Sequence, residues 1–271
     1  MSATITSPVS LDLRKTLRAL KLGQMLDTLP DRLALARQQK MTHADFLELV
    51  LADEVTRRDA KSASLRARAA GLDPGMRLDT WDETAAVRYD HELWNELASL
   101  RFLDGPHGAL LLGPVGVGKT HMACALGHIA VRRRRTVTMA PASKLFKKLK
   151  AARLDNSLDA EMRRLAGIEL LILDDFALQP LDPMETADFY QLCVERHRKA
   201  ATIVTSNRTA EEWLTMMADP LLAQSAVDRL VSTAHELVIE GESYRRRQKP
   251  SISSQPSGAS IDRQEGDHHD Q

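Results

Sequence analysis

Residues 109–120 read ALLLGPVGVGKT and carry the most specific structural signal in the chain. The apolar run ALLL predicts a short buried strand. The next eight residues, GPVGVGKT, match the pattern G-x-x-x-x-G-K-[ST] in full, and the amphipathic run HMACALGHIAV follows at 121–131. A strand, a glycine-rich loop and a helix in this order hold the phosphates of a nucleotide. A glycine-rich turn without a ligand would leave the Lys-Thr pair at its end unexplained.

The loop residues predict how the phosphates are held. Gly113, Gly116 and Gly118 allow a tight turn whose amides point inward. Lys119 is expected to reach the β- and γ-phosphates, and the Thr120 hydroxyl to ligate Mg²⁺. The helix that begins near Lys119 adds amides that favour an anion. The predicted cofactors are ATP and Mg²⁺. The predicted nucleotide-binding residues are Gly113, Pro114, Gly116, Val117, Gly118, Lys119, Thr120 and His121.

A second apolar run, ELLILDD at 169–175, ends in two acids. We expect Asp174 to hold the Mg²⁺ shell through water, and Asp175 to orient or deprotonate the attacking water. The alternative is a strand end with two solvated acids. A complete phosphate loop upstream makes that the weaker interpretation.

A third run, ATIVTS at 201–206, is followed by Asn207. This amide could hold the attacking water or sense the γ-phosphate. Equally, Ser206, Asn207 or Thr209 could cap the helix predicted at EEWL or form the turn before it. The residues alone do not separate these two interpretations.

Short apolar runs alternate with helical patterns from about residue 100 onward. This alternation predicts an α/β fold with a P-loop core, in which a five-stranded parallel sheet is flanked by helices on both faces. The predicted strands are 109–112, 136–140, 169–173, 201–206 and 236–240, and the clearest helices are 119–134, 183–199 and 220–233.

The N-terminal part of the chain, residues 11–70, is predicted to be mostly helical. Leu13, Leu17, Leu20 and Met25 indicate a first amphipathic helix that Pro30 breaks.

A longer helix is predicted from Thr42 to Ala70, and Thr42 with Asp45 resembles a capping box. The first half of this helix carries an apolar stripe of Phe46, Leu47, Val50, Leu51 and Val55. Its second half is basic, which leaves two interpretations. The helix is a packing or oligomerisation element, or it contacts DNA through Arg57, Arg58, Lys61, Arg66 and Arg68.

Gly71, Pro74 and Gly75 punctuate the chain and predict a domain boundary. We expect a small all-helical N-terminal domain at 1–75 for DNA or partner binding or for oligomerisation, an ATPase domain at 76–249, and a disordered tail at 250–271. His268 and His269 are interpreted as part of the tail composition rather than as metal ligands.

The composition excludes several classes of protein. Only 3 Trp, 3 Tyr and 5 Phe are present, which argues against an all-β fold and against aromatic platforms for base stacking. Cys124 and Cys193 are too few for a disulfide framework and too far apart for a clustered zinc site. No apolar run approaches the length of a membrane span, and no signal peptide is evident. We therefore predict a cytoplasmic protein that does not enter the membrane.

The 37 basic and 37 acidic side chains sum to zero, but they are segregated along the chain. Residues 105–154 hold 10 basic and no acidic side chains, whereas residues 155–240 hold 7 and 16. We expect the bases to gather where phosphate binds. Binding through backbone phosphates would be sequence-tolerant and salt-sensitive. A solvated basic face is the alternative. The predicted DNA contacts are Arg132, Arg133, Arg134, Arg135, Lys144, Lys147, Lys148, Lys150 and Arg153, together with Arg57 and Arg58.

The order GPVGVGKT, LLILDD, TSN, DRL and GESYR resembles an AAA+ ATPase. More narrowly, the DRLV…GESYR ending and the N-terminal FLELVLADEVTRRDA resemble the IstB-like ATP-binding proteins. These are transposition helpers of insertion sequences and are similar to DnaC helicase loaders. The resemblance covers about residues 10–249. The stretch VRRRRTV is more basic than the motif demands.

The resemblance implies roles that the residues alone do not assign. Lys119 and Thr120 belong to Walker A, Asp174 and Asp175 to Walker B, and Asn207 to sensor 1. Arg229 matches an arginine finger that acts on a neighbouring subunit, and Arg245 matches the sensor 2 arginine. The implied catalytic residues are Lys119, Asp175, Asn207, Arg229 and Arg245, and the implied metal site is Thr120 with Asp174.

The resemblance also implies partners. An arginine used on a neighbour implies a homo-oligomer with ATP at the subunit interfaces. The family binds double-stranded DNA with little sequence preference and directs a partner transposase to its target. A DnaC-type helicase loader would have nearly the same core. A small-molecule phosphotransferase would need a lid and an acceptor pocket, and neither is clear in the sequence. A nucleotide-gated switch with negligible turnover is a further alternative.

Overall fold

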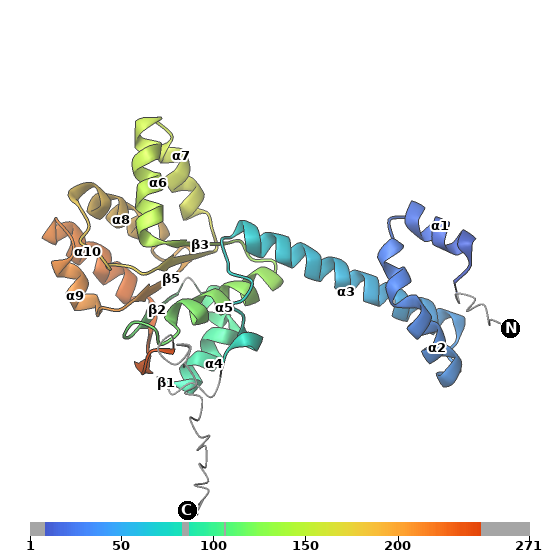
Figure 1. Cartoon of the computed structure of the whole chain (residues 1–271). Coiled ribbons are helices and arrows are strands. Elements are labelled where there is room, and N and C mark those ends of the chain that lie inside the picture. The colour runs from blue at the N-terminus through green and yellow to red at the C-terminus, as the bar shows by residue number, and fades with distance from the viewer. Residues whose placement is uncertain (1–8, 83–86, 106, 245–271) are drawn as a thin grey trace, which may run out of the picture.

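The computed structural model describes residues 9–82, 87–105 and 107–244. Its centre is a parallel sheet of five strands in the order β3-β4-β5-β2-β6 (Figure 1). This arrangement confirms the predicted sheet. The strands are β2 (Gly108–Leu112), β3 (Val137–Pro141), β4 (Leu170–Asp174), β5 (Ala201–Ser206) and β6 (Ala234–Val238). A separate antiparallel pair joins β1 (Val87–Arg88) to β7 (Glu240–Gly241), which the sequence did not predict.

Two hydrophobic cores cover the two faces of the sheet. Leu110 and Leu112 of β2 point into one core, and Ala109 and Leu111 into the other. Because both faces are buried, the strands are continuously apolar rather than alternating with polar residues. Helices α6 (Ala142–Leu154), α7 (Leu158–Ala166), α8 (Pro183–Arg196), α9 (Ala210–Thr215) and α10 (Pro220–Val231) cover the first face. Helices α4 (His91–Ser99) and α5 (Lys119–Arg132) cover the second.

The parallel direction of the strands determines which loops meet. The segments that follow β2, β4 and β5 leave the sheet at the same carboxyl edge. The phosphate loop, Asp174 with Asp175, and Asn207 are therefore brought together at this edge. Helix α5 leads from the carboxyl edge back to the amino edge, where β3 begins.

The N-terminal helices differ in part from the prediction. The first helix, α1 (Leu11–Ala19), ends well before Pro30, and Met25 lies in a separate 3-10 turn. Pro30 does not break a helix but lies in the first turn of α2 (Leu29–Gln39), where its missing N–H is not needed. The single helix predicted up to Pro30 is therefore wrong.

The long helix α3 (His43–Ala69) confirms the prediction and its capping box. Asp45 N donates to Thr42 Oγ1 at 3.2 Å. Val50 is buried in a small core beneath α1 and α2, and Phe46 packs against that core, whereas Leu47 at 57%, Leu51 at 42% and Val55 at 59% are exposed. Two of the five predicted stripe residues therefore pack within this chain.

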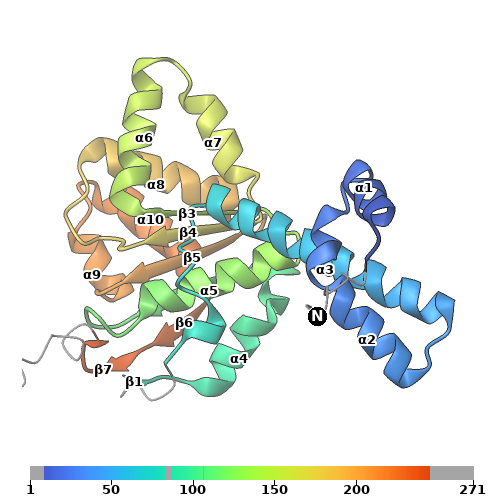
Figure 2. The ribbon, with the colours of Figure 1, turned by 45° about the vertical axis from the view of Figure 1, so that its right-hand side comes forward.

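Helix α3 links the N-terminal helices to the sheet domain (Figure 2). Ala67 and Ala70 at its carboxyl end are buried in the core around α5. The Arg66 guanidinium donates to Val131 O at 3.2 Å, and Met139 N donates to Ala70 O at 2.7 Å. Among the described residues, no helix combines the length and the apolar character that crossing a membrane requires.

A buried arginine joins three elements on the first face of the sheet. Arg196, at the end of α8, donates from Nε to Thr202 Oγ1 at 2.9 Å and from Nη1 to Ile168 O at 2.8 Å. It also donates to the carbonyls of Leu165 and Ala201. Burial lowers the pKa of Arg196 to about 10, so the guanidinium stays charged at neutral pH. The arginine thus fastens α8 to the end of α7 and to the start of β5.

We expect Arg196→Leu to lower the free energy of unfolding by about 3 kcal/mol, because it leaves several buried acceptors unpaired. The control is Arg198→Leu, since Arg198 is exposed and has no hydrogen bond within the described residues. That change should stay within about 0.5 kcal/mol. Urea unfolding of both variants measures the difference, and equal losses would contradict the role given to Arg196.

Candidate nucleotide-binding site

The phosphate loop, Gly113–Thr120, is folded tightly against neighbouring segments. Gly116 and Gly118 adopt φ values of 90° and 100°, a region that side chains disfavour. A Cβ on Gly116 would lie 2.2 Å from Ser243 Oγ, and one on Gly118 would lie 2.6 Å from the Trp81 ring. Both positions therefore favour glycine; the pattern itself fixes Gly118, whereas Gly116 stands at one of its variable positions.

Lys119 begins α5 and is nearly buried beneath the loop. Its Nζ donates to Gly113 O and Pro114 O, each at 2.7 Å. Val117 anchors the middle of the loop because its side chain is buried in the core. The ammonium group is thereby held across the loop, where it can meet the phosphates of a bound nucleotide.

Thr120 and Asp174 meet across the sheet edge, as the predicted Mg²⁺ site requires. Thr120 Oγ1 donates to Asp174 Oδ1 at 2.9 Å. Burial raises the pKa of the Asp174 carboxyl, and hydrogen bonds from Thr205 and Thr120 oppose that shift. A hydroxyl and a carboxylate are hard oxygen ligands that suit Mg²⁺, which keeps several of its waters. The residues present therefore fit the ion.

Asp175 is exposed, whereas its neighbour Asp174 is buried. Its backbone adopts the left-handed region at φ 52°, and its side chain is exposed whereas that of Phe176 is fully buried. Its N–H donates to Thr205 Oγ1 at 3.0 Å. The two neighbouring acids thus have separate surroundings, one enclosed beside Thr120 and one open to water. Their roles in hydrolysis stay predictions.

The two interpretations of Asn207 can now be compared. The helix cap belongs to Thr209, whose hydroxyl accepts from Glu212 N at 3.4 Å. Ser206 Oγ donates to Phe176 O at 2.8 Å and accepts from Trp213 Nε1 at 3.0 Å. Ser206 Oγ also accepts Arg208 N at 3.2 Å across the turn. Asn207 is exposed at the same edge as Asp174, and its side chain has no hydrogen bond within the described residues. Its role as a sensor of the γ-phosphate stays a prediction.

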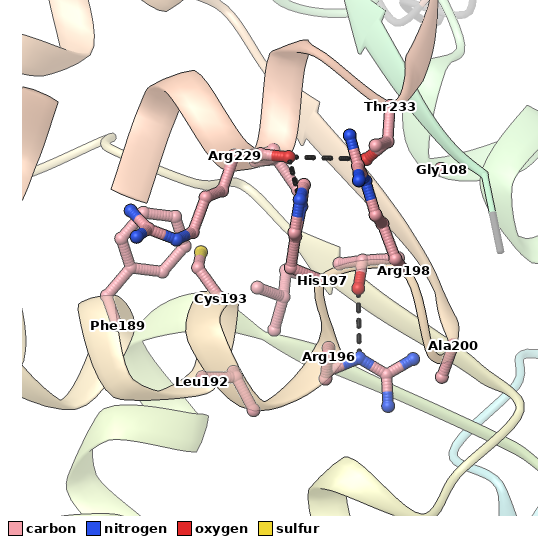
Figure 3. A pocket seen from close by; sticks show the side chains of 13 residues that line it. Gly108, Phe189, Leu192, Cys193, Arg196, His197, Arg198, Ala200, Arg229 and Thr233 are labelled. Carbon is pink, nitrogen blue, oxygen red and sulfur yellow. Dashed lines mark hydrogen bonds between the residues drawn. The ribbon is translucent and has the colours of Figure 1, made fainter. Parts of the chain in front are cut away.

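Arg229 lies at the opposite edge of the sheet from the phosphate loop of its own chain. It lies near the end of α10 and lines a pocket with Gly108, the first residue of β2, and with Arg198 (Figure 3). Its Nη1 donates to Ser225 O at 2.8 Å, and its guanidinium carbon is 5.8 Å from the Tyr190 ring centroid. The length of a strand therefore separates this arginine from its own phosphate loop.

Several residues near the loop were not predicted from the sequence. The Trp81 ring packs beside Gly118 and meets the His121 ring edge-on at 5.3 Å between centroids. Tyr244 N donates to Gly116 O at 2.9 Å. The contact of Tyr244 could have been anticipated from the GESYR motif, which contains this residue. Trp81, 32 positions before the loop, belongs to no motif and could not have been found from the sequence. Arg245 lies outside the described residues.

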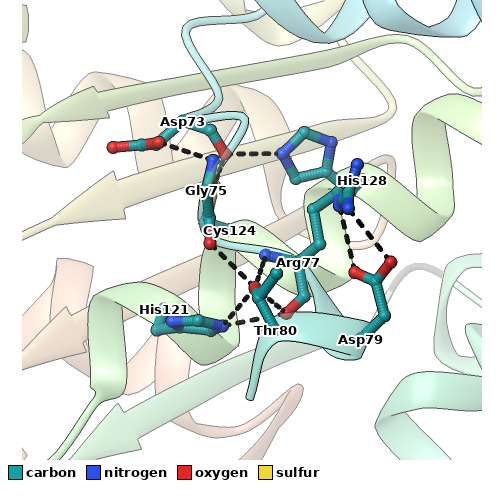
Figure 4. A network of polar contacts seen from close by, with 8 residues as sticks. All are labelled: Asp73, Gly75, Arg77, Asp79, Thr80, His121, Cys124 and His128. Atoms are coloured by element: carbon teal, nitrogen blue, oxygen red, sulfur yellow. Dashed lines mark hydrogen bonds and ion pairs between the residues drawn. The ribbon is translucent and has the colours of Figure 1, made fainter.

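The segment between α3 and the sheet domain is bonded to one face of α5 (Figure 4). His121 Nε2 is 2.9 Å from Arg77 O, and His128 Nε2 is 2.8 Å from Asp73 O. The thiol of Cys124 donates to the same Asp73 carbonyl at 3.7 Å. The side chain of His121, predicted to bind nucleotide, is therefore engaged with this segment, which leaves its main chain for phosphate.

The predicted DNA-contacting residues do not form one surface. Arg132 ends α5 and Arg133–Arg135 follow it at the amino edge, whereas α6 begins at the carboxyl edge, so these bases are divided between the two edges of the sheet. Their contact with DNA stays a prediction. Helix α5 carries the chain from one edge to the other between the two groups.

Most of these bases are also bonded within the chain. Arg57 and Arg58 pair with Glu54, Arg134 with Asp59, Arg135 with Glu169 and Asp104, Lys148 with Glu161, Lys150 with Asp182 and Glu185, and Arg153 with Asp188. Arg133 donates to Ser99 O. Arg132, Lys144 and Lys147 are exposed and have no such bond within the described residues.

This phosphate loop, with a Walker B pair beside it and a parallel sheet in this strand order, defines a P-loop protein of the AAA+ class. The chain belongs to the IstB-like ATP binding protein family, whose model matches residues 15–252.

Proteins of insertion sequences are among its relatives. An ATP-binding protein in an insertion sequence of Mycobacterium tuberculosis (strain ATCC 25618 / H37Rv) is 37% identical over 88% of this chain and 95% of its own length. The ATP-binding protein of insertion sequence IS21 from Pseudomonas aeruginosa is 33% identical over 88% and 90%. The crystal structure of DnaI is similar in fold, with a TM-score of 0.50 and 20% identity over 60% of this chain and 90% of that one.

Proposed function

We propose that this chain is a Mg²⁺-dependent ATPase that assembles as a homo-oligomer on double-stranded DNA and assists a partner transposase in DNA transposition. The observation that carries the proposal is the hydrogen bond from Thr120 to Asp174 across the mouth of the phosphate loop. Membership of the IstB-like family supports ATP as the ligand. A cytoplasmic location stays a prediction.

The proposed reaction divides the work among residues at the carboxyl edge. The loop amides and Lys119 hold the phosphates, and Thr120 with Asp174 holds Mg²⁺, which would neutralise the charge that develops on phosphate oxygens. Asp175, exposed beside this site, orients or deprotonates the attacking water. Asn207 is placed to contact the water or the γ-phosphate.

The position of Arg229 supports an assembly of several copies. Strands of five residues, such as β2, separate the amino and carboxyl edges by roughly 16 Å, and Arg229 is on the part of α10 that leads to the amino edge, away from the phosphate loop of its own chain. A neighbouring copy that sets its phosphate loop against the pocket around Arg229 would bring the two together. The proposed ATP site is therefore shared between subunits.

Mixing two inactive variants tests the shared site. Arg229→Ala lacks the finger and Lys119→Ala lacks the loop lysine, and each alone should lose most ATPase activity. An equal mixture should recover about a quarter of the wild-type rate, because one interface in four joins two intact halves. The control is each variant assayed alone at the total protein concentration of the mixture. No recovery in the mixture, or full activity of Arg229→Ala alone, would count against a shared site.

The unpaired bases of α6 support contact with DNA. Lys144 and Lys147 are exposed on α6, and neither has an ion-pair partner among the described residues. Exposed lysines of this kind bind the phosphate backbone of DNA, and such binding is independent of base sequence. The neighbouring Lys148 and Lys150 are already neutralised by acids of α7 and of the segment at the start of α8.

Two double variants of equal charge test this surface. Lys144→Gln with Lys147→Gln should weaken duplex binding and reduce the slope of log affinity against log salt by about two. Lys148→Gln with Lys150→Gln removes the same charge from paired positions and should change the slope less. Fluorescence anisotropy across a salt series with ATP measures both. Equal slopes for the two double variants would rule out a special role for the unpaired pair.

A DnaC-type helicase loader remains the second candidate, because it would share the core. The relatives from Mycobacterium tuberculosis and Pseudomonas aeruginosa are proteins of insertion sequences, which favours the transposition helper. Co-purification with a transposase rather than with a replicative helicase would decide between them.

A further inference from the structure

Thr205 lies in β5, beside the carboxyl end of β4, where Asp174 and Asp175 follow one another. Strand β5 runs between β4 and β2, and the pairing of Leu173 with Val204 sets the next residue, Thr205, beside Asp174. The Thr205 side chain is fully buried. A buried hydroxyl has to find its hydrogen-bond partners within the protein.

Both hydrogen bonds of this hydroxyl go to the acid pair. Thr205 Oγ1 accepts the N–H of Asp175 at 3.0 Å and donates to Asp174 Oδ1 at 2.5 Å. The roles follow from the chemistry, because a backbone N–H can only donate and a hydroxyl has a single proton to give. The main chain adds a third link, since Phe176 N donates to Thr205 O at 2.9 Å.

These bonds fix the two acids in different ways. Thr120 and Thr205 both donate to Oδ1 of Asp174, so they set the rotation of the carboxylate and neither occupies Oδ2. Asp175 is held through its main chain, in a left-handed conformation that few residues adopt without support. That turn exposes Asp175 and buries Phe176.

We propose that Thr205 is a positioning residue of the ATPase site. Its hydroxyl holds the Asp174 carboxylate in the rotation that serves Mg²⁺, and it holds the turn that presents Asp175 to the attacking water. Thr205 acts through these two acids and contacts neither the nucleotide nor the water. The inference rests on the ATP hydrolysis proposed above and extends it to a residue of the neighbouring strand.

The test compares Thr205→Val, which removes the hydroxyl, with Thr205→Ser, which keeps it. Mutation of a residue that orients a metal ligand typically lowers activity by about 10- to 100-fold. The kcat of Thr205→Val should therefore fall by that factor. KM for ATP should stay within about threefold, because the loop and Lys119 are unchanged. The Mg²⁺ concentration for half-maximal rate should rise. Thr205→Ser should recover most of kcat.

The matched control is Thr186→Val in α8. Thr186 is also fully buried, and its hydroxyl accepts the N–H of Ala218 at 3.2 Å, but no acid shares it. This variant should lose stability much as Thr205→Val does while its kcat and Mg²⁺ requirement stay at wild-type values. The comparison separates the loss of a buried hydroxyl from the loss of positioning.

A Thr205→Val protein that hydrolyses ATP at the wild-type rate with the wild-type Mg²⁺ requirement would overturn the inference. So would a Thr205→Ser protein as slow as Thr205→Val, or a loss confined to KM. If Thr205→Val does not fold, Thr205→Ala is compared with Thr205→Ser on the same terms. A wild-type protein without ATPase activity would instead contradict the proposed function, so the two failures are distinct.

Discussion

The buried carboxylate of Asp174 is the constraint on which the site depends. An ionised acid removed from water is unfavourable unless hydrogen bonds or a cation compensate it. Here burial raises its pKa, and two hydroxyls, from α5 and from β5, oppose the shift. Those hydroxyls reach one oxygen only because β2, β4 and β5 run parallel and end at the same edge. A divalent cation beside Asp174 would complete the compensation, which makes the fold and the ligand interdependent.

The zero net charge of the chain reflects pairing between neighbouring segments. The acid-free segment 105–154 pairs with acids mainly from the segments on either side of it, for example Arg135 with Asp104 and Lys150 with Asp182. Exposed pairs of this kind contribute only about 0–1 kcal/mol, so they neutralise charge more than they stabilise the fold. Basic side chains outside these pairs, such as Lys144 and Lys147, keep a charge that no nearby acid in the described part of the chain neutralises. We propose that DNA phosphates bind there.

The sequence predicted the strands, the phosphate loop and the acid pair because each has a local signal. An apolar run such as ELLIL predicts a buried strand wherever it lies, and GPVGVGKT between a strand and a helix is specific for a phosphate loop. The two-residue strands β1 and β7 are too short to leave a pattern. The prediction at Pro30 is wrong because a proline is compatible both with the end of a helix and with its first turn, and here it lies in the first turn of α2. Thr205 and Trp81 act only through neighbours that the tertiary fold supplies, so neither has a local signal.

Helix α3 connects the sheet domain, which holds the site, to the N-terminal helices. Its carboxyl end is buried against α5, and the segment after it is bonded to His121, next to Thr120, the proposed Mg²⁺ ligand. Its amino-terminal half presents Leu47, Leu51 and Val55 to solvent. Helix α3 therefore has one end packed beside the proposed nucleotide site and an exposed apolar stripe at the other end.

We propose that ATP hydrolysis belongs to an assembly on DNA rather than to a single chain. Sedimentation velocity combined with an ATPase assay, with and without duplex DNA, tests it most directly. We predict that ATP and duplex together shift the protein from small species to a large complex, and that the rate per chain rises with this shift. A monomer that hydrolyses ATP at one rate whether or not DNA is present, or that fails to bind duplex with ATP, would contradict it.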